Sequence, residues 1–352
     1  MTESMPFAGI ATFLKSPFVP EPGAADGEVA VIGVPYDERT TGRAGAREGP
    51  RALRAISTNW AYRDGTEPYW DGEAGVPLLG SVRLVDAGDV ALAPTASPDT
   101  NRGRIAARVA AIVRAGLFPV VLGGDHSITY PVLEGAVRGR AEASGDEQAA
   151  ADAWATGGAN EGSGSEARAD EESGARRALH LVQFDAHMDY WDDIGGERFT
   201  HASPIIRAHE EGLIQGVTQY GIRGLHTQSD NVALARERGV ASVWCQQAKL
   251  ELLARGVERL VEHIEPGVGV WITFDIDCLD PAVAPGTGTP EPGGFTYYEA
   301  KALLLAVSSR ANVVGMDLVE VNPLYDPGQL AALHGARLIL DTVGAVFERR
   351  RG

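Results

Sequence analysis

Cysteine is almost missing from the sequence, which contains only Cys245 and Cys278 among its 352 residues. Two cysteines are too few for a disulfide framework, and no Cys/His spacing around them is typical of a zinc finger. The low cysteine content indicates a reducing compartment. We therefore expect a cytoplasmic protein.

Long apolar runs are also missing. No stretch approaches the ~18 apolar residues that a membrane span requires. The N-terminal residues, MTESMPFAGIATFLKSPFVP, lack the basic region and apolar core of a secretory signal. We expect no membrane partner and no export.

Basic side chains are scarce: 31 Lys and Arg stand against 48 Asp and Glu, which gives a net charge of −17. This charge argues against binding nucleic acid or an anionic membrane through the overall field of the protein. An acidic, hydrated surface favours solubility in concentrated salt, and it would also attract a small cationic substrate. Composition leaves both interpretations open.

The remaining sequence shows short apolar runs that alternate with helix-period segments. This pattern is typical of a parallel sheet covered by helices on both faces. It predicts a three-layer α/β/α fold with a mostly parallel sheet, in a single domain over residues 1–352. The expected strands are residues 28–34, 82–86, 118–122, 179–184, 217–222, 268–274 and 313–319.

One segment departs from this pattern. Residues 141–177 are rich in Ala, Gly, Ser and acidic residues, and Trp154 is their only large apolar side chain. Such a composition buries too little apolar surface to offset the entropy of ordering the chain. We expect a disordered acidic insertion in a surface connection; the alternative is that Trp154 docks it over a neighbouring surface or site.

Acidic residues and histidines follow three of the predicted strands. Asp125-His126-Ser127 follows residues 118–122, Asp185-Ala186-His187-Met188-Asp189 follows residues 179–184, and Asp275-Ile276-Asp277 follows residues 268–274. In an open α/β sheet, ligands bind at the carboxyl ends of the strands. These three groups are therefore expected to meet at one edge of the sheet.

The spacing within the groups suits a metal centre. Residues at i, i+2 and i+4 of an extended chain share one side, so Asp185, His187 and Asp189 can converge, as can Asp275 and Asp277. Packed carboxylates repel one another unless a cation neutralises them. Four carboxylates and two imidazoles exceed the needs of one tetrahedral zinc, and they suit two divalent ions such as Mn²⁺.

Any one of these aspartates could instead cap a helix or pair with an arginine. Three groups at three strand ends make that explanation remote for the set. Asp125 is not counted among the ligands, and we expect it to orient His126 or the surrounding loop.

Five blocks of the sequence resemble the arginase/agmatinase (ureohydrolase) family. They are GGDHS at 123–127, DAHMD at 185–189, DIDCLDPAVAPGTGTPEPGG at 275–294, TTGRAGAREGP at 40–50 and GMDLVEVNPLYD at 315–326. They occur in the family's order and extend over most of the chain from about residue 29, apart from residues 141–177. The resemblance implies an arginase-like fold and binuclear metal-dependent hydrolysis of a guanidino compound that releases urea.

The resemblance also assigns metal ligands by position. It implies that one ion is held by His126, Asp185, Asp189 and Asp275, and the other by Asp185, His187, Asp275 and Asp277. Asp185 and Asp275 would then bridge the two ions. The ions are expected to be Mn²⁺, although Ni²⁺, Co²⁺ or Fe²⁺ could occupy a site of this kind.

The catalytic residues that the resemblance implies are the ligand Asp189 and two further residues, Glu320 and His201. Glu320 matches the glutamate that pairs with the guanidinium nitrogens, a geometry natural to a carboxylate. His201 falls where the family places a proton-shuttling histidine, a role suited to an imidazole. The residue after His201 is Ala202 where glycine is usual, which puts the shape of this loop in doubt.

The substrate expected first is agmatine, which would be converted to putrescine and urea. The resemblance implies it, and a predicted substrate mouth formed by Tyr190, Trp191, Asp192 and Asp193 offers two acids to its ammonium group. A substrate with a carboxylate, such as 4-guanidinobutyrate or 3-guanidinopropionate, would need a cation, for which Arg43, Arg47, Arg198 and Arg223 are candidates. Free guanidine would need an aromatic plug, for which Trp60, Tyr62, Tyr190 and Trp191 are candidates.

Two other classes of protein remain as alternatives. A deacetylase-like amide hydrolase would need one zinc ion, and a non-catalytic relative would have lost ligands, Glu320 or His201. The resemblance further implies a homo-oligomer, a trimer or a hexamer. The remaining histidines are expected to be structural or exposed: His180, His209, His226, His263 and His334.

Overall fold

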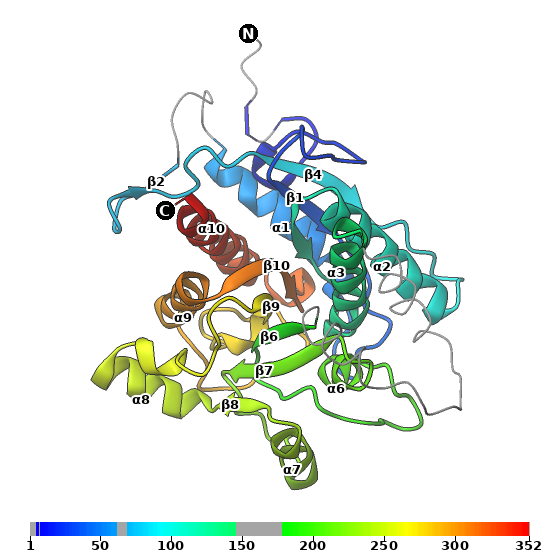
Figure 1. The fold of residues 1–352 in the computed structure, drawn as a ribbon, viewed down its shortest axis with the longest axis vertical. Coiled ribbons are helices and arrows are strands. Elements are labelled where there is room, and N and C mark those ends of the chain that lie inside the picture. The colour runs from blue at the N-terminus through cyan, green and yellow to red at the C-terminus, as the bar shows by residue number, and fades with distance from the viewer. Residues whose placement is uncertain (1–4, 7, 62–68, 146–177, 352) are drawn as a thin grey trace.

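The computed structural model describes residues 5–6, 8–61, 69–145 and 178–351, and its centre is a sheet of eight parallel strands (Figure 1). The strand order is β4-β1-β5-β10-β9-β6-β7-β8. The strands are β1 (Val29–Gly33), β4 (Leu84–Asp89), β5 (Phe118–Leu122), β6 (Leu179–Phe184), β7 (Ile214–Tyr220), β8 (Ala241–Val243), β9 (Gly269–Asp275) and β10 (Asn312–Val319). The predicted α/β fold with a mostly parallel sheet is confirmed.

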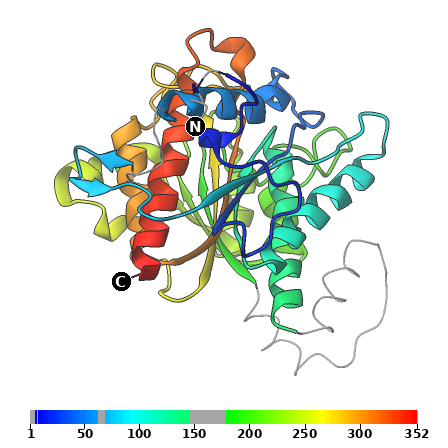
Figure 2. The same cartoon turned by 90° about the horizontal axis from the view of Figure 1, so that it is seen from above.

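Helices form a layer on each face of the sheet (Figure 2). The first layer contains α1, α9 and α10, and the second contains α2, α3 and α6. The α-helices are α1 (Gly49–Ser57), α2 (Pro98–Arg114), α3 (Thr129–Ala143), α6 (Pro204–Glu210), α7 (Ser229–Glu237), α8 (Cys245–Arg255), α9 (Tyr297–Arg310) and α10 (Leu330–Arg351).

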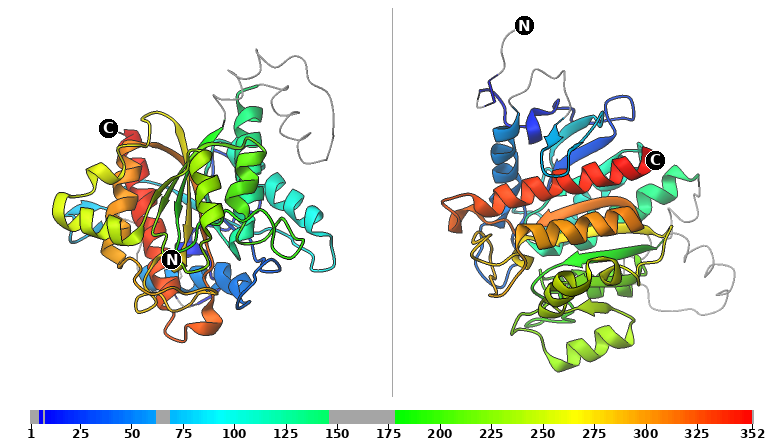
Figure 3. Two further views of the ribbon diagram at one scale, coloured as in Figure 1. Left: turned by 90° about the horizontal axis from the view of Figure 1, so that it is seen from below. Right: turned by 90° about the vertical axis from the view of Figure 1, so that its left-hand side faces the viewer.

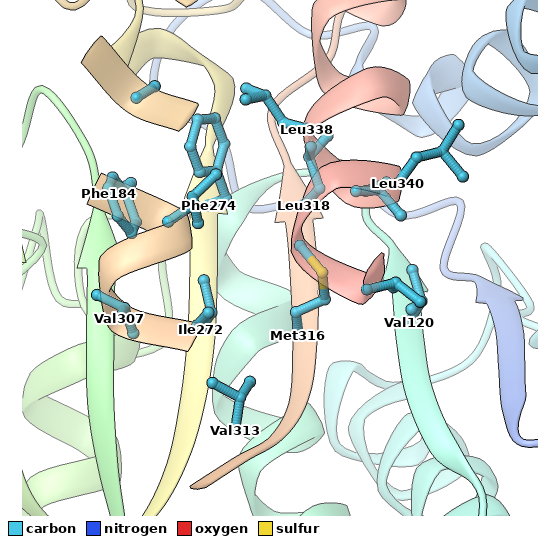
Figure 4. Close-up of a cluster of buried hydrophobic side chains, with 14 of the residues drawn as sticks. Val120, Phe184, Ile272, Phe274, Val307, Val313, Met316, Leu318, Leu338 and Leu340 are labelled. Carbon is cyan, nitrogen blue, oxygen red and sulfur yellow. The ribbon is translucent and has the colours of Figure 1, made fainter. Parts of the chain in front are cut away.

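Strand residues pack alternately into two hydrophobic cores. Val120 and Leu122 belong to the core beneath α10, whereas Val121 belongs to the core on the α2 and α3 side. In the first core, Met316 and Leu318 lie close to Leu338 of α10 (Figure 4). Because both faces are buried, the strands are mostly apolar, and polar exceptions such as Gln183 and Asp317 are buried with hydrogen-bond partners.

Helices within one layer also pack closely. A Cβ on Gly135 of α3 would lie 2.4 Å from the carbonyl oxygen of Ala106 in α2, so this helix pair approaches nearer than an alanine would allow. On the other face, α9 and α10 run side by side (Figure 3). The start of α9 is fixed by a capping box between Thr296 and Glu299.

Helix α10 is long and apolar enough, by length and composition, to cross a membrane. However, most of its apolar stretch is buried inside the fold. Packing against the sheet therefore explains its apolar character. The expectation that no membrane span is present stays a prediction.

The short hairpin of β2 (Trp70–Asp71) and β3 (Val76–Pro77) joins the α9 and α10 layer through buried charges. Asp71 accepts hydrogen bonds from Lys301 Nζ at 2.8 Å and from Arg337 Nη2 at 3.1 Å. Asp341 pairs with the same two cations. The hydrogen bond from Lys301, followed by that from the Ala74 N–H, lowers the pKa of Asp71 to about 2.

Asp71→Asn is expected to lower the free energy of unfolding by about 2 kcal/mol at pH 7, because it removes a charge-assisted hydrogen bond at a buried position. A folded-state pKa below the ordinary value stabilises the fold above that value, and the stabilisation is lost as pH falls toward about 2. Urea unfolding from pH 7 to pH 3 should show the difference from wild type shrinking below about pH 4. The control is Asp99→Asn, at an exposed acid. This role of Asp71 would be contradicted if the loss of unfolding free energy in Asp71→Asn did not change with pH, or if it equalled the loss in the control.

The structure differs from the sequence-based expectations at several boundaries. Strand β4 extends to Asp89 instead of ending at 86, and β7 is Ile214–Tyr220 instead of 217–222, because the chain turns at Gly221, whose φ is 102°. Strand β8 was not predicted, since three half-buried residues carry little pattern.

Part of the predicted insertion lies outside the described residues. Residues 141–143 end α3, whereas residues 146–177, with Trp154, are not described. The same holds for Tyr62, a candidate for the aromatic plug.

Candidate metal centre

The candidate site lies at the carboxyl edge of the four middle strands, β5, β10, β9 and β6. His126 follows β5, Asp185 follows β6, Asp275 ends β9 and Glu320 follows β10. Because these strands are neighbours and parallel, their carboxyl ends bring the four side chains to one place.

The loop after β5 is positioned by a close backbone contact. A Cβ on Gly124 would lie 1.7 Å from the carbonyl oxygen of Tyr36, so a side chain cannot be placed there. The Asp125 N–H donates to that carbonyl at 2.8 Å, and the Asp125 carboxylate accepts from the N–H groups of Arg39 and Ser127. Asp125 therefore holds the loop that carries His126.

Three carboxylates surround Nδ1 of His126. The distances are 2.8 Å to Asp189 Oδ2, 3.0 Å to Asp185 Oδ2 and 3.3 Å to Asp275 Oδ2. All four side chains are buried. These residues are the set that the resemblance assigned to the first ion.

A second group forms around His187. Its Nδ1 lies 3.1 Å from Asp277 Oδ2 and 3.5 Å from Asp185 Oδ1. Asp185 thus presents one oxygen to each histidine, which is the arrangement expected of a bridging ligand. Gln183 Nε2 donates to Asp185 Oδ2 at 2.7 Å and helps to fix this carboxylate.

The chemistry of this donor set fits two divalent cations. His126 Nδ1 is buried and makes no hydrogen bond of acceptable geometry within the described residues, although acidic oxygens surround it. Burial, then the charge of Asp185, raises the pKa of Asp189 to about 6. Burial, then the charges of Asp277 and Asp185, raises the pKa of Asp275 well above its ordinary value. Bound cations would keep all these carboxylates ionised.

Behind His126 lies a buried chain of hydrogen bonds that sequence reasoning missed. His126 Nε2 is 2.9 Å from Thr273 Oγ1, and the Thr273 hydroxyl donates to Asp317 Oδ1 at 2.6 Å. Asp317 also accepts from Trp271 Nε1 at 2.7 Å and Thr129 Oγ1 at 3.0 Å. The chain places the ring proton on Nε2 and leaves the Nδ1 lone pair facing the carboxylates.

Thr273→Val is expected to weaken binding of the first metal ion by about 10-fold to 100-fold, since it removes the acceptor that fixes the His126 tautomer without changing side-chain shape. Metal titration by calorimetry measures this effect directly. Thr289→Val is the matched control, because Thr289 donates to Asp277 at the other end of the cluster. If Thr273→Val and Thr289→Val weakened metal binding at both ion sites to the same extent, the result would contradict a specific role of the hydrogen-bond chain through Thr273 and Asp317.

His201 and Glu320 lie together beside the metal centre. Glu320 Oε1 accepts from the His126 N–H at 2.9 Å and lies 3.2 Å from His201 Nδ1. Burial lowers the pKa of His201, but the hydrogen bond and charge of Glu320 outweigh it and raise the pKa to about 9. On the other side of the ring, Thr41 Oγ1 lies 2.8 Å from Nε2.

Two residues of the site have a strained backbone. Asp189 has a φ of 49° and Glu320 a φ of 62°, in the left-handed region that non-glycine residues rarely adopt. Such conformations persist where the surrounding structure enforces them, and they are concentrated at functional sites. In these conformations the Asp189 carboxylate lies beside His126 Nδ1 and the Glu320 carboxylate lies beside the His201 ring.

A cavity of about 250 Å³ opens beside the cluster. The ligands His187, Asp189 and Asp275 line it together with His201. The other described lining residues are Thr41, Met188, Trp191, Ile194, Ala202, His226, Thr227, Asn231 and Thr289.

Of the predicted substrate mouth, only Trp191 lines this cavity among the described residues. The Tyr190 ring is buried in the core, and its hydroxyl lies 2.9 Å from His209 Nδ1. Asp192 pairs with Arg198 and Arg207, and Asp193 accepts from the Gly196 N–H. Both acids thus have partners within their own loop or on α6, which the local sequence does not show.

The four arginines considered for a carboxylate substrate are also engaged elsewhere. Arg43 donates to the carbonyls of Thr287 and Gly288. Arg47 pairs with Asp37, Arg198 pairs with Asp192 and Glu210, and Arg223 donates to backbone carbonyls. Trp60, an aromatic candidate for the plug, packs against the hydrophobic core under α10.

Several cavity residues escaped the sequence reasoning. His226 was grouped with the structural or exposed histidines, and Thr41 and Asn231 were not considered. His201 and Thr41 are 160 positions apart in sequence, and only the fold brings them together. For His226 and Asn231, the signal that was available is their place shortly after a strand that ends at the same edge of the sheet.

Comparison with known proteins gives the same picture. The sequence matches the model of the arginase family over residues 27–149 and 156–344. It is 34% identical to a guanidinopropionase from Pseudomonas aeruginosa, over 97% of this chain and 93% of that protein. It is 35% identical to an agmatinase from Proteus mirabilis, over 94% of this chain and 90% of that protein.

A solved structure is also similar over its whole length. The proclavaminate amidino hydrolase from Streptomyces clavuligerus superposes with a TM-score of 0.78 and 29% sequence identity, covering 98% of this chain and 100% of that one. The family match extends over most of the sequence, and the clustered ligands occupy the places that the resemblance assigned to them. The chain belongs to the arginase family.

Proposed function

We propose that this protein hydrolyses a linear guanidino compound to urea and an amine, with agmatine as the first substrate and putrescine as the amine. The observation that carries the proposal is the clustering of six buried or half-buried ligands, three of which line one cavity with His201, while Glu320 lies 3.2 Å from the His201 ring. The agmatinase and guanidinopropionase relatives support the same reaction class.

Two divalent ions held by the six ligands would supply a Lewis acid and a nucleophile at neutral pH. The O-rich donor set favours Mn²⁺. Asp185 lies between the two histidines and Asp275 lies beside His126, and both would help to hold the ions.

Glu320 provides the anionic partner for the substrate. Its carboxylate is buried, with 1% of the residue exposed, so its charge acts in a medium of low dielectric constant. A guanidinium group presents paired N–H donors that match a carboxylate. Glu320 would therefore orient the guanidinium with its carbon toward the metal centre.

His201 provides the proton for the leaving amine. The hydrogen bond and charge of Glu320 outweigh burial and raise the pKa of His201 to about 9, which favours uptake of a proton by the imidazole, and the ring lines the cavity. Departure of the amine requires a proton on nitrogen, which a positioned imidazolium can donate. Thr41 holds the ring in place, because its N–H donates to His201 Nε2 at 3.0 Å and its hydroxyl lies 2.8 Å from the same nitrogen.

The cavity supports agmatine over guanidino acids. No lysine or arginine stands among its described lining residues, and the arginines considered earlier are bound elsewhere. A substrate carboxylate would therefore enter without a cationic partner, near a cluster of acids. The guanidinopropionase relative keeps 3-guanidinopropionate as the second candidate.

The wider setting is part of the same proposal. Cys245 and Cys278 are free thiols, which supports a cytoplasmic location.

Leu250 and Leu253 on α8 are 60% and 87% exposed, which supports burial of this face in a homo-oligomer.

The test is a urea assay on the Mn²⁺-loaded protein with agmatine, arginine, 4-guanidinobutyrate, 3-guanidinopropionate and guanidine in parallel, at high and low salt. We expect the highest kcat/KM with agmatine. A higher kcat/KM with a guanidino acid would contradict agmatine as the substrate but would still support hydrolysis of a guanidino compound to urea. Turnover of amides with one bound zinc ion, and no urea from any guanidine, would favour the deacetylase-like alternative.

A further inference from the structure

The side chain of Arg223 binds backbone carbonyls beside the metal centre. Arg223 follows β7 and is partly buried. Within the described part of the chain it forms no ion pair with an Asp or Glu, so its N–H groups act on the positions of backbone segments. Its guanidinium donates to six carbonyl oxygens at 2.7–3.3 Å, those of Gly221, Asp277, Cys278, Leu279, Glu291 and Pro292.

One nitrogen of this guanidinium joins the two ends of the connection between β9 and α9. Nη2 donates to the Asp277 carbonyl at 2.8 Å, near the start of the connection, and to the Glu291 carbonyl at 2.7 Å, near its end. Nε extends the second contact, because it donates to the Pro292 carbonyl at 3.1 Å. Carbonyls away from water require donors, so these bonds favour one arrangement of the two ends.

The same two ends face the two ring nitrogens of His187. Asp277 Oδ2 lies 3.1 Å from Nδ1, and Glu291 Oε1 lies 3.9 Å from Nε2. His187 Nε2 is buried and makes no hydrogen bond within the described residues. A carboxylate on that side favours a proton on Nε2, which leaves the Nδ1 lone pair for a metal ion.

The backbone of Arg223 is also bonded to the segment after β6 that carries ligands. Its N–H donates to the Ala186 carbonyl at 2.9 Å. The Ala186 N–H in turn donates to Asp277 Oδ1 at 3.0 Å. Arg223 therefore contacts both segments that supply ligands to the second ion, whereas no hydrogen bond within the described residues joins it to His126 or Asp189.

We propose that Arg223 is a positioning residue for the second metal ion, because it fixes the segments that place Asp277 and Glu291 at the two nitrogens of His187. The inference rests on the two-ion centre of the proposed function. A guanidinium is a planar fork of five donors, whereas a lysine offers three donors on a flexible stem. A lysine would keep the positive charge but could not hold both ends of the connection in the same geometry. The shape of the side chain, and not its charge alone, therefore matters.

Titration of the metal-free protein with Mn²⁺, followed by calorimetry, tests this role in Arg223→Lys and Arg223→Met. Both variants should weaken binding of the second ion by about 10-fold to 100-fold, the range for groups that orient a metal ligand, and leave the first ion within about twofold. His187→Ala, which lacks a ligand of the second ion, shows which binding step belongs to that ion. Arg198→Met is the matched control, since Arg198 pairs with acids at the surface, and it should change neither step.

Hydrogen exchange of the metal-free proteins supplies a second measurement. Amides within residues 277–280 and 291–294 should exchange faster in Arg223→Met than in wild type, while those of residues 126–133 should not change. Wild-type affinity in Arg223→Lys, or equal weakening of both binding steps, would overturn the role of the fork. If the wild-type protein binds only one ion, the two-ion function fails; faster exchange at residues 277–280 and 291–294 would then still support the positioning role, and unchanged exchange would overturn it.

Discussion

Asp185→Asn is expected to abolish the two-metal centre and to reduce kcat/KM by about 10³-fold or more, since two bound ions supply several kcal/mol of transition-state stabilisation. The Asp185 carboxylate presents Oδ2 to His126 and Oδ1 to His187, at 3.0 and 3.5 Å. An amide keeps the shape but loses the charge and one acceptor. The substitution therefore removes a ligand from both ion sites at once.

Metal content and thermal unfolding measure this prediction together. An ion that binds only the folded state raises Tm, so Mn²⁺ should stabilise the wild-type protein and stabilise the variant much less. Asp193→Asn, at an exposed acid in the neighbouring loop, is the matched control. Two ions per chain and unchanged activity in Asp185→Asn would contradict the bridging role.

Glu320→Gln is expected to lower kcat/KM by about 10³-fold while metal content stays at the wild-type level, because the substitution removes the buried charge that binds and orients the cationic guanidinium. It should also lower the pKa of His201. In the wild type, burial opposes the charged imidazole and Glu320 overcomes that effect, which raises the pKa to about 9. Without the Glu320 charge, burial remains and the ring loses its proton at a lower pH.

The imidazole signals of His201, followed by NMR across pH 5 to 10, test the second half of this prediction. Glu210→Gln, in an ion-paired glutamate on α6, serves as the control for loss of a carboxylate elsewhere. An unchanged titration of His201 in Glu320→Gln would show that another group sets its charge, and kcat/KM near the wild-type value would remove Glu320 from the mechanism.

The parts of the fold and site that were predictable are local in sequence. Buried parallel strands are mostly apolar runs, so the expected strands at residues 118–122 and 179–184 match β5 and β6 at both ends. The ligands follow directly after such strands, and parallel neighbours bring their carboxyl ends together. The spacing predicted that Asp185, His187 and Asp189 converge, and in the structure Asp185 contacts His187 while Asp189 contacts His126, although the chain is not extended at Asp189, whose φ is 49°.

The parts that could not be predicted depend on partners distant in the chain. Asp192 looked free to bind an ammonium, but Arg207, fifteen positions later, occupies it. Asp317 looked like an ordinary strand residue, and its support of His126 through Thr273 appears only when β10 and β9 are paired. The sequence pattern predicts where a side chain lies on its helix or strand. It does not predict which residues, distant in the sequence, that side chain will contact.

The most direct test of the central claim follows urea and metal in one sample. Protein carrying two Mn²⁺ ions per chain is mixed with agmatine labelled with ¹³C at the guanidinium carbon, and the reaction is monitored by NMR. We predict a urea carbon signal, an equimolar amount of putrescine, and neither product from Asp185→Asn. Two bound ions per chain with no urea from agmatine or any other guanidino compound would contradict the claim.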